Sequence, residues 1–480
     1  MAEKAQKKRD LSLLPTGGKI YFVGIGGISM SGLSEIAKNL GYRCGGADMH
    51  LSPRTDGLKS KGIHIYPGHS AENLKDFQPD LVVHTAAILP GNPELCFAAE
   101  KEIPMMTRAE FLGCLTASYK KVINISGTHG KTTTTAMTTL ILLEAGIDPT
   151  MHLGADLPIF ENTVHMGKGN ELLVSEACEF QRSFLAFYST TAAVTNIDYD
   201  HVDCYANLSE VIDVFAEFTK KLAQDGTLIV PAFDKNAAEA IRRIPDYRST
   251  MPNIITTGKK EDIFEMTGKH PDVYAENIHY QNGCPVFDVY INDQFYTDIE
   301  LAIPGDHNIF NALTAIACAM LHGGNANSAK KALAGFVGAD GRYTIKGTFL
   351  GATVVADYAH HPAAARATLA AASNVPHKKT WVVFQPLTYK RTEVLFEDYV
   401  TSLLPCEHII FAEIFSDREI NPGTISSADI AAEINKRGGN AEFYPEKIQI
   451  KERLSKLVEE GDLILLLGPE DIRDMAEMLV

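Results

Sequence analysis

Residues 127–135 combine two glycines, a lysine and a run of threonines directly after the apolar residues 122–125. A glycine-rich turn between a strand and a helix presents backbone N–H groups and the positive end of the helix dipole to a phosphate. In such a loop Lys131 reaches the outer phosphates and the Thr132 hydroxyl holds Mg²⁺. Ile125 stands where a full Walker A motif has its first glycine. We interpret the segment as a nucleoside-triphosphate site, because an ordinary glycine turn does not explain the Gly-Lys-Thr order.

Two clusters of acidic side chains follow later apolar runs. Glu176 lies within residues 175–179, and His201 lies between Asp200 and Asp203. Parallel strands end at one edge of a sheet, so we expect both clusters beside the phosphate loop. Mg²⁺ prefers oxygen ligands, which Glu176 offers, whereas histidine is a less typical ligand. We favour a metal site over the alternative, which is a pair of acidic loops exposed to water.

A second glycine-rich turn occupies residues 24–29 and includes Gly26 and Gly27. It has Ser29 where the dinucleotide-binding fingerprint has its third glycine. Asp48 follows a second expected strand, roughly where such a fold places its ribose-binding acid. A dinucleotide site, another nucleotide site and a tight turn without a ligand fit this weak pattern equally well.

Asn308 and Asn311 stand three residues apart on an expected helix. Side-chain amides carry the donors and acceptors that read the edge of a nucleic base. The alternative is a helix N-terminus capped by Asp306 or His307. Without further information the capping interpretation is the stronger one.

The last third of the chain offers two more polar clusters beyond expected strands. Asp357 and the consecutive histidines His360 and His361 precede Pro362, which suggests either a metal site or a strand-to-helix turn. Arg391 carries a fork of donors suited to a carboxylate or phosphate. Each cluster alone is more often structural, but together with a phosphate loop they indicate one composite site.

The composition is that of a globular protein with several domains. The chain has 480 residues, of which 45% are hydrophobic and 22% charged, and its net charge is −16. About 150 residues per domain suggests three domains. An acidic chain is a poor candidate for binding nucleic acid, and no apolar stretch reaches the roughly 18 residues that span a bilayer. Residues 1–10 do not resemble a signal peptide. The eight scattered cysteines suit a reducing cytoplasm, and we expect most of them to be small core residues.

Short apolar runs alternate with helical stretches, which predicts parallel α/β sheets. The third segment is expected to begin near residue 335. We expect strands at residues 19–23, 81–84, 122–125, 171–175, 192–197, 227–230, 353–356, 381–384, 408–412 and 463–467. We expect helices at residues 30–40, 136–145, 209–222 and 308–321. Residues 271–303 alternate in the manner of antiparallel strands.

These motifs, in this order, resemble the Mur ligase family from Tyr21 to Asp471. The most specific segments are residues 23–27, 127–132, 200–203, 307–311, 357–362 and 384–386. His129 within the phosphate loop and the doubled histidine before Pro362 resemble the alanine-adding branch of the family.

The resemblance implies three α/β domains. Residues 1–119 are expected to form a Rossmann-like domain that binds the UDP part of a sugar nucleotide. Residues 120–334 are expected to form the central domain that binds ATP and Mg²⁺, with a parallel sheet and a small antiparallel part. Residues 335–480 are expected to form a Rossmann-like C-terminal domain that brings the amino acid. The implied reaction joins L-alanine to the carboxylate of UDP-N-acetylmuramate through an acyl phosphate, and we expect a cytoplasmic monomer or weak homodimer.

The resemblance also assigns roles to individual residues. The implied catalytic residues are Lys131, His201 and His360, and the implied metal ligands are Thr132, Glu176 and His201. The implied ATP-binding residues are Gly127, Thr128, His129, Gly130, Lys131, Thr132, Thr133, His307, Asn308, Asn311, Arg342 and Asp357. The implied substrate-binding residues are Gly26, Gly27, Asp48, His69, Arg108, Tyr358, His360 and Arg391.

Several positions depart from the family pattern. Cys178 stands where many members have an aspartate, and only Arg342 remains of a usual pair of arginines. Thr388 replaces an arginine found in some relatives, residues 467–472 differ from the usual glycine-rich run, and no counterpart of a modified lysine is evident. These departures leave the fold and reaction type intact but weaken the prediction of amino-acid specificity.

Three classes of function remain open from the sequence. A ligase explains both glycine-rich turns, and a relative that adds glycine, serine or a peptide is its nearest competitor. A nicotinamide-dependent oxidoreductase explains the first turn but leaves the second without a role. A non-catalytic nucleotide-binding regulator would use the same scaffold without turnover.

Overall fold

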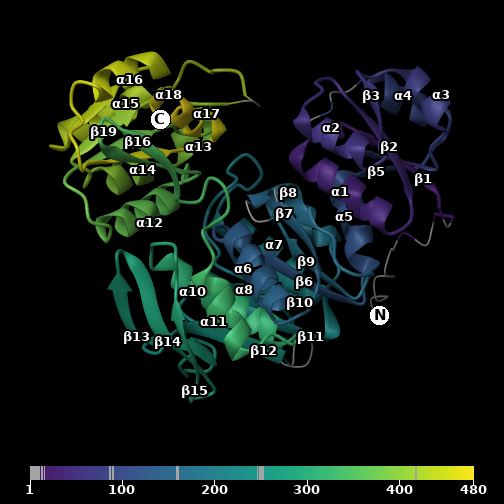
Figure 1. The fold of residues 1–480 in the computed structure, drawn as a ribbon, viewed down its shortest axis with the longest axis horizontal. Coiled ribbons are helices and arrows are strands. Elements are labelled where there is room, and N and C mark those ends of the chain that lie inside the picture. The colour runs from purple at the N-terminus through teal and green to yellow at the C-terminus, as the bar shows by residue number, and fades with distance from the viewer. Residues whose placement is uncertain are drawn as a thin grey trace.

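The computed structural model describes residues 11, 14, 15, 17–85, 88, 91–157, 160, 162–245, 247, 253–416 and 419–480. Residues 1–10, where the sequence indicates no signal peptide, lie outside this set. The described residues form three α/β units in succession, each built on its own sheet, as predicted (Figure 1). None of the helices described is both long and apolar enough to cross a bilayer.

The N-terminal unit is a five-stranded parallel sheet in the order β3-β2-β1-β4-β5. Its central strand β1 is almost entirely buried, as a parallel strand covered by helices on both faces should be. The elements are β1 (Lys19–Val23), α1 (Ile28–Asn39), β2 (Arg43–Asp48), α2 (Pro53–Ser60), β3 (His64–Pro67), α3 (Ala71–Phe77), β4 (Leu81–His84), α4 (Pro93–Glu100), β5 (Met105–Thr107) and α5 (Arg108–Ala117).

The central unit contains a ten-stranded sheet in the order β15-β14-β13-β12-β11-β10-β6-β9-β7-β8. Strands β13 to β15 pair antiparallel, as predicted, and so do β7 and β8. The elements are β6 (Lys121–Ser126), α6 (Lys131–Glu144), β7 (Thr150–Leu157), β8 (Asn162–His165), β9 (Leu172–Glu176), the 3-10 helix η3 (Phe180–Ala186), β10 (Ser189–Val194), α7 (Leu208–Lys220), β11 (Leu222–Pro231), α8 (Lys235–Arg242), β12 (Asn253–Lys259), β13 (Val273–Gln281), β14 (Cys284–Ile291), β15 (Gln294–Glu300), α10 (His307–Met320) and α11 (Ala326–Ala334).

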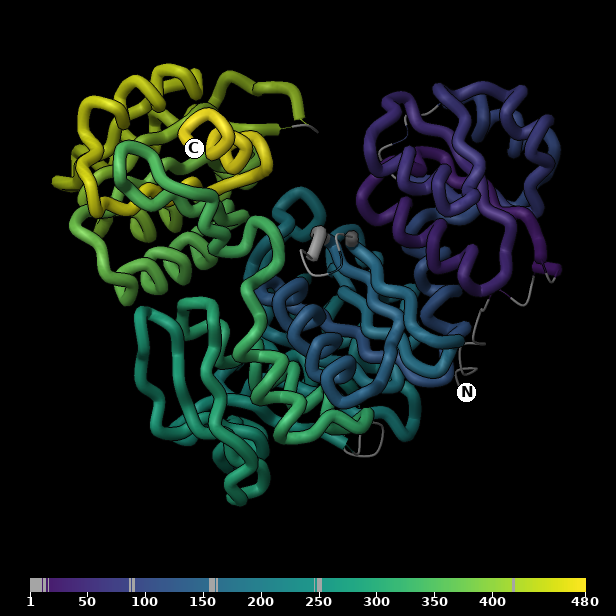
Figure 2. The backbone as a smooth tube through the Cα atoms, viewed as in Figure 1, coloured from purple at the N-terminus to yellow at the C-terminus, as the bar shows by residue number. Residues whose placement is uncertain are grey.

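The C-terminal unit is a six-stranded sheet in the order β16-β17-β21-β18-β19-β20, parallel except for the β16–β17 pair. Figure 2 shows the chain passing from the central unit to this unit after α11. The elements are β16 (Thr344–Phe349), β17 (Ala352–Asp357), α12 (Pro362–Ser373), β18 (Thr380–Phe384), α13 (Tyr389–Val394), α14 (Phe396–Leu403), β19 (His408–Phe411), α15 (Ser427–Lys436), β20 (Ala441–Phe443), α16 (Lys447–Leu454), β21 (Leu463–Leu467), α17 (Glu470–Arg473) and α18 (Ala476–Leu479).

Apolar side chains on both faces of the central sheet fix its helices in place. Ile125 of β6 belongs to a cluster that includes Met137 of α6 and Ile309 of α10. The opposite face belongs to a second cluster, in which Val122 is grouped with Phe184 of η3 and residues of the N-terminal unit. Burial of these side chains holds β6, and hence the loop that follows it, between two helical layers.

Helix α6 begins at Lys131, five residues before the predicted start at Ala136. The threonines, whose polar run hid the start of the helix in the sequence, are buried. Their hydroxyl groups donate hydrogen bonds to backbone carbonyls one turn earlier. Thr135 donates to Lys131 at 2.8 Å, and Thr139 donates to Thr135 at 2.9 Å. The polar run is therefore compatible with a helix because its hydroxyls are satisfied within the helix itself.

All eight cysteines are free thiols, as the sequence suggests. The expectation that most are core residues is wrong, because only Cys44, Cys114 and Cys318 are buried. Cys96 is exposed, and Cys178 is partly exposed at the end of a central strand. Four of the thiols, Cys178 included, therefore lie at the boundary between core and solvent rather than within the core.

The loop between β6 and α6 depends on Gly130, which caps α6 with a left-handed backbone (φ +84°). A Cβ atom there would lie 2.4 Å from Asn311 Oδ1, whereas one on Gly146 (φ +80°) would meet nothing within 4 Å. Both Gly130→Ala and Gly146→Ala should lose roughly 1–2 kcal/mol to left-handed strain. Only Gly130→Ala should also distort the loop, with a larger fall in melting temperature and loss of binding to a non-hydrolysable ATP analogue in calorimetry. Equal behaviour of the two variants would contradict this account of the loop.

Candidate active site

The phosphate loop leaves the N-terminus of α6 without a side-chain cap, so its backbone N–H groups are free for an anion. Lys131 Nζ contacts the Glu179 carboxylate at 3.1 and 3.3 Å and the Thr128 carbonyl at 3.0 Å. Burial lowers the pKa of Lys131, but the Glu179 carboxylate together with Cys178 and Glu176 outweighs burial and shifts that pKa upward. Lys131 is therefore a fixed cation beside the loop.

Thr132 and Glu176 form the pair predicted to hold Mg²⁺. Thr132 lies in the first turn of α6, after β6, and Glu176 ends the neighbouring strand β9, so that Thr132 Oγ1 lies 2.9 Å from Glu176 Oε2. Adjacent oxygen ligands of an octahedral Mg²⁺ ion, each at about 2.0–2.1 Å from the metal, lie about 2.9 Å apart. Glu176 also accepts a bond from the Gly154 N–H at 3.0 Å. The chemistry and spacing of these two oxygens fit the ion.

His201 lies on the other side of the loop, beyond β10. Its backbone is left-handed (φ +52°), and its N–H donates to Asp200 Oδ1 at 2.6 Å. Its ring Nε2 is 3.7 Å from Glu179 Oε1, and its Nδ1 has no hydrogen-bond partner. Burial lowers the pKa of His201, so the imidazole is neutral and offers a lone pair to a cation.

The C-terminal unit reaches this edge through Arg391 at the start of α13. Arg391 is 3% exposed, and its Nη2 lies 2.6 Å from Asp200 Oδ1, the same oxygen that holds the His201 N–H. Burial would raise the pKa of Asp200, but Arg391 holds that pKa well below its usual range. Arg391 Nε and Nη1 have no partner. The guanidinium is thus held by Asp200 through Nη2 and keeps unused N–H donors on two separate edges.

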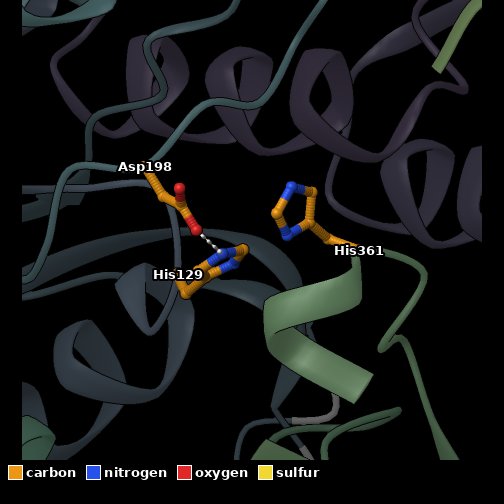
Figure 3. A group of neighbouring side chains, drawn as sticks. All are labelled: His129, Asp198 and His361. Carbon is orange, nitrogen blue, oxygen red and sulfur yellow. Dashed lines mark ion pairs between the residues drawn. The ribbon is translucent and has the colours of Figure 1, made fainter. Parts of the chain in front are cut away.

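His361 makes a second contact between the units, and Figure 3 shows its side chain beside those of His129 and Asp198. Its Nε2–H donates to the Tyr199 carbonyl at 3.2 Å, and its Nδ1 accepts the Ala363 N–H at 3.2 Å, which caps α12. Burial lowers the pKa of His361 to about 4, so it is neutral. His129 Nε2 lies 3.8 Å from Asp198 Oδ2. Both ring nitrogens of His361 are thus engaged: Nε2 joins it to the central unit, and Nδ1 caps its own helix α12.

His360 and Tyr358 lie next to this contact. Tyr399 donates a hydrogen bond to the His360 carbonyl at 2.8 Å, and His360 Nδ1 lies 2.9 Å from the Tyr358 carbonyl. Burial holds the pKa of His360 well below its usual range. The Tyr358 ring lies between the guanidinium groups of Arg342 and Arg473, at 5.1 and 5.2 Å.

Asn308 and Asn311 are buried, and Asn311 hydrogen-bonds to the first turn of α6 next to the phosphate loop. Asn311 accepts a bond from Thr134 at 3.2 Å and donates to Asn308 at 3.0 Å, and Asn308 donates to the Pro304 carbonyl at 2.7 Å. The alternative of N-capping by Asp306 or His307 is wrong, because the N-cap residue Asp306 makes no side-chain cap bond. Burial lowers the pKa of the neighbouring His307 to about 4.

Asp357 and Arg342 lie at the beginning of the C-terminal unit. Asp357 accepts bonds from the Tyr343 N–H at 3.0 Å and the Thr368 hydroxyl at 3.2 Å. Burial raises the pKa of Asp357. The Arg342 guanidinium donates to the Gly341 carbonyl at 3.3 Å.

The residues predicted to bind the sugar nucleotide each make a separate contact. Asp48 accepts the Gly26 N–H at 2.9 Å and so closes the first glycine turn next to Gly27. His69 Nδ1 lies 2.7 Å from the buried Glu94 carboxylate. Arg108 donates a hydrogen bond to the Ser29 hydroxyl at 3.1 Å. Burial lowers the pKa of Arg108, and the charges of Cys178 and Glu176 oppose that shift. Arg108 therefore links the N-terminal unit electrostatically to the central site.

The sequence assigned no role to Glu179 and Asp200, although each holds a predicted site residue in place. Glu179 holds Lys131, and Asp200 joins His201 to Arg391. Both lie in clusters noted from the sequence, so the position at a strand end was the available signal. Their partners could not be inferred, because Lys131 and Arg391 are far away in the chain.

Family models match the chain in three consecutive parts. They are the Mur ligase family catalytic domain at residues 19–120, the Mur ligase middle domain at residues 125–319 and the Mur ligase glutamate ligase domain at residues 341–469. Proteins named UDP-N-acetylmuramate–L-alanine ligase from Clostridium novyi and Clostridium acetobutylicum are 42% and 40% identical, each covering 96% of this chain and 97% of the relative.

Solved structures give the same result. The UDP-N-acetylmuramate–alanine ligase of Thermotoga maritima is 26% identical with a TM-score of 0.76, over 96% of this chain and 98% of that chain. A murein peptide ligase from Psychrobacter arcticus is 23% identical with a TM-score of 0.68, over the same shares of the two chains, and shares the fold. The three matching models and the 42% identity together show that this chain belongs to the Mur ligase family.

Proposed function

We propose that the chain is an ATP-dependent ligase that joins L-alanine to the carboxylate of UDP-N-acetylmuramate, releasing ADP and phosphate, in peptidoglycan precursor synthesis. The observation that carries this proposal is the shared edge where Lys131 and the Thr132–Glu176 pair of the central unit meet Arg391 of the C-terminal unit through Asp200. The relatives at 40–42% identity, which bear the name of this activity, support it.

The first step is phosphorylation of a carboxylate, which is otherwise a poor electrophile. A carboxylate oxygen of the sugar nucleotide attacks the γ-phosphorus, and ADP leaves. The free N–H groups of α6 and the Lys131 ammonium bind the phosphates and offset the charge that develops on them. Mg²⁺ held by Thr132 and Glu176, with His201 at a second ion, would neutralise further charge on the transferred group.

The second step is attack of the alanine amine on the acyl phosphate. The amine adds to the carbonyl carbon, loses a proton, and phosphate leaves as the amide forms. The charge of Arg391 and its unused N–H donors suit the carboxylate of the amino acid. We assign neutral His360, with Tyr358, to the same pocket. Because fixed groups hold both reactants, much of the rate gain is expected from orientation.

The remaining roles follow the family assignments. We propose that Gly26, Gly27, Asp48, His69 and Arg108 bind the UDP-sugar, and that ATP is bound by residues 127–133 together with His307, Asn308, Asn311, Arg342 and Asp357. The limits 1–119, 120–334 and 335–480 stay our proposed domain boundaries, and a cytoplasmic monomer or weak homodimer stays a prediction. A ligase that adds glycine, serine or a peptide is the alternative, which a panel of acceptors assayed by phosphate release distinguishes.

Lys131→Ala tests the enzymatic proposal. Loss of the buried ammonium should lower kcat/KM by about a hundredfold or more, as for other charges aimed at a transition state. The assay is phosphate release in the presence of ATP, UDP-N-acetylmuramate and L-alanine. Lys120→Ala, at an exposed lysine paired with Glu171, is the matched control and should retain activity. ADP formation without both co-substrates, or full activity of Lys131→Ala, would refute the ligase.

Asp200→Asn tests how Arg391 is positioned. Asparagine still accepts the His201 N–H but removes the charge that aligns the guanidinium, so KM for L-alanine should rise about tenfold while KM for ATP changes little. Glu397→Gln, which breaks the exposed pair with Arg437, is the control and should leave both KM values unchanged. Melting temperatures identify any general loss of folding. An equal rise in both KM values would argue against a specific effect on the amino-acid pocket.

A further inference from the structure

Cys178 places a thiol within the proposed reaction centre. It lies between the end of β9 and η3, directly before Glu179. Its Sγ atom, a Glu179 carboxylate oxygen and a His201 ring nitrogen all lie within 4.8 Å of one another. The three side chains come from the ends of β9 and β10, the two strands that flank β6 in the sheet. The sheet thus brings sulfur, oxygen and nitrogen donors together beside the phosphate loop.

This donor set differs in kind from the Thr132–Glu176 pair. Two oxygens suit Mg²⁺, whereas a thiolate with imidazole and carboxylate selects softer ions such as Zn²⁺ and Co²⁺. In a tetrahedral zinc site with bonds of about 2.0–2.3 Å, neighbouring donor atoms lie about 3.3–3.7 Å apart. His201 Nε2 and Glu179 Oε1 are already 3.7 Å apart, and His201 Nδ1 has no partner. Small side-chain movements would complete the geometry.

The other group of potential ligands, His129, Asp198 and His361, is less suitable. Both ring nitrogens of His361 are used, one by the Tyr199 carbonyl and one by the Ala363 N–H. Coordination there would break the contact that joins α12 to the central unit. In the cluster around Cys178, Glu179 can keep the shorter contact of its Oε2 with Lys131, and only the 3.3 Å contact of Oε1 is given up when that oxygen turns to a cation.

We propose that Cys178, Glu179 and His201 form a binding site for a thiophilic divalent cation of the Zn²⁺ class. On binding, the Cys178 thiol gives its proton to solvent and its sulfur forms a bond to the metal, whose oxidation state does not change. Glu179 and His201 supply the next two ligands, and water supplies the fourth. Occupation removes His201 from its role with Mg²⁺ and adds positive charge beside Lys131, so the site is inhibitory to the ligase. The inhibition rests on the proposed function, but the binding does not.

Co²⁺ titration of the metal-free full-length chain, without nucleotide, tests the site directly. Binding should produce a thiolate-to-cobalt charge-transfer band in the near ultraviolet that excess Mg²⁺ does not remove. Cys178→Ser should abolish the band and weaken Co²⁺ binding at least tenfold, and Cys178→Asp should retain binding without the band. Cys96→Ser, at the exposed cysteine of α4, is the matched control and should keep the band. Absence of the band, or its persistence in Cys178→Ser, would overturn the proposal.

X-ray absorption of the unmodified protein with one equivalent of Zn²⁺ avoids any dependence on variants that fold poorly. One sulfur in the metal's coordination shell is expected, and a shell of only nitrogen and oxygen would refute the site. In ligase assays, Zn²⁺ should inhibit the wild-type chain at least tenfold more strongly than Cys178→Ser. A chain that binds Co²⁺ through sulfur yet shows no ligase activity would refute the proposed function and leave the cation site intact.

Discussion

The order of three neighbouring parallel strands is the constraint on which the site depends. Strands β9, β6 and β10 lie side by side, so the residues that follow them meet at one edge although they are far apart in sequence. Glu176 ends β9 and Glu179 follows it, Lys131 and Thr132 follow β6, and His201 follows β10. Apolar clusters on both faces hold these strands, so the side chains at the edge are positioned by a rigid core.

At that edge, burial makes each charge depend on its partner. Lys131 and Glu179 are 11% and 2% exposed, and Arg391 and Asp200 are 3% and 9% exposed. Removing one member of such a pair leaves an unpaired buried charge, which costs about 3–5 kcal/mol. The second pair joins two structural units, so docking of the C-terminal unit and ordering of the His201 backbone are linked through one carboxylate oxygen. Docking of the C-terminal unit and assembly of the site therefore depend on the same contact.

Much of this arrangement could be predicted because it follows from local pattern. Periodicity located most strands and the antiparallel hairpins, and residue type with strand-end position located Lys131, Thr132 and Glu176. The start of α6 could not be located, because threonine hydroxyls satisfied inside a helix look like any other polar run. The Asp200–Arg391 pair could not be predicted either, because it depends on how the central and C-terminal units pack against each other. Local signals thus identified the donors but not which groups hold them in place.

The missing Walker A glycine illustrates how one strand changes a motif. Ile125 is fully buried in β6 and pairs in register with Ala193 on one side and Glu176 on the other. The strand therefore continues through the position where the longer motif already turns. The turn is made instead at Gly127, whose φ is +132° and where a Cβ atom would lie 2.1 Å from Thr195 Oγ1. Only glycine permits so close an approach, and the shorter loop places Lys131 against Glu179, just beyond the end of β9.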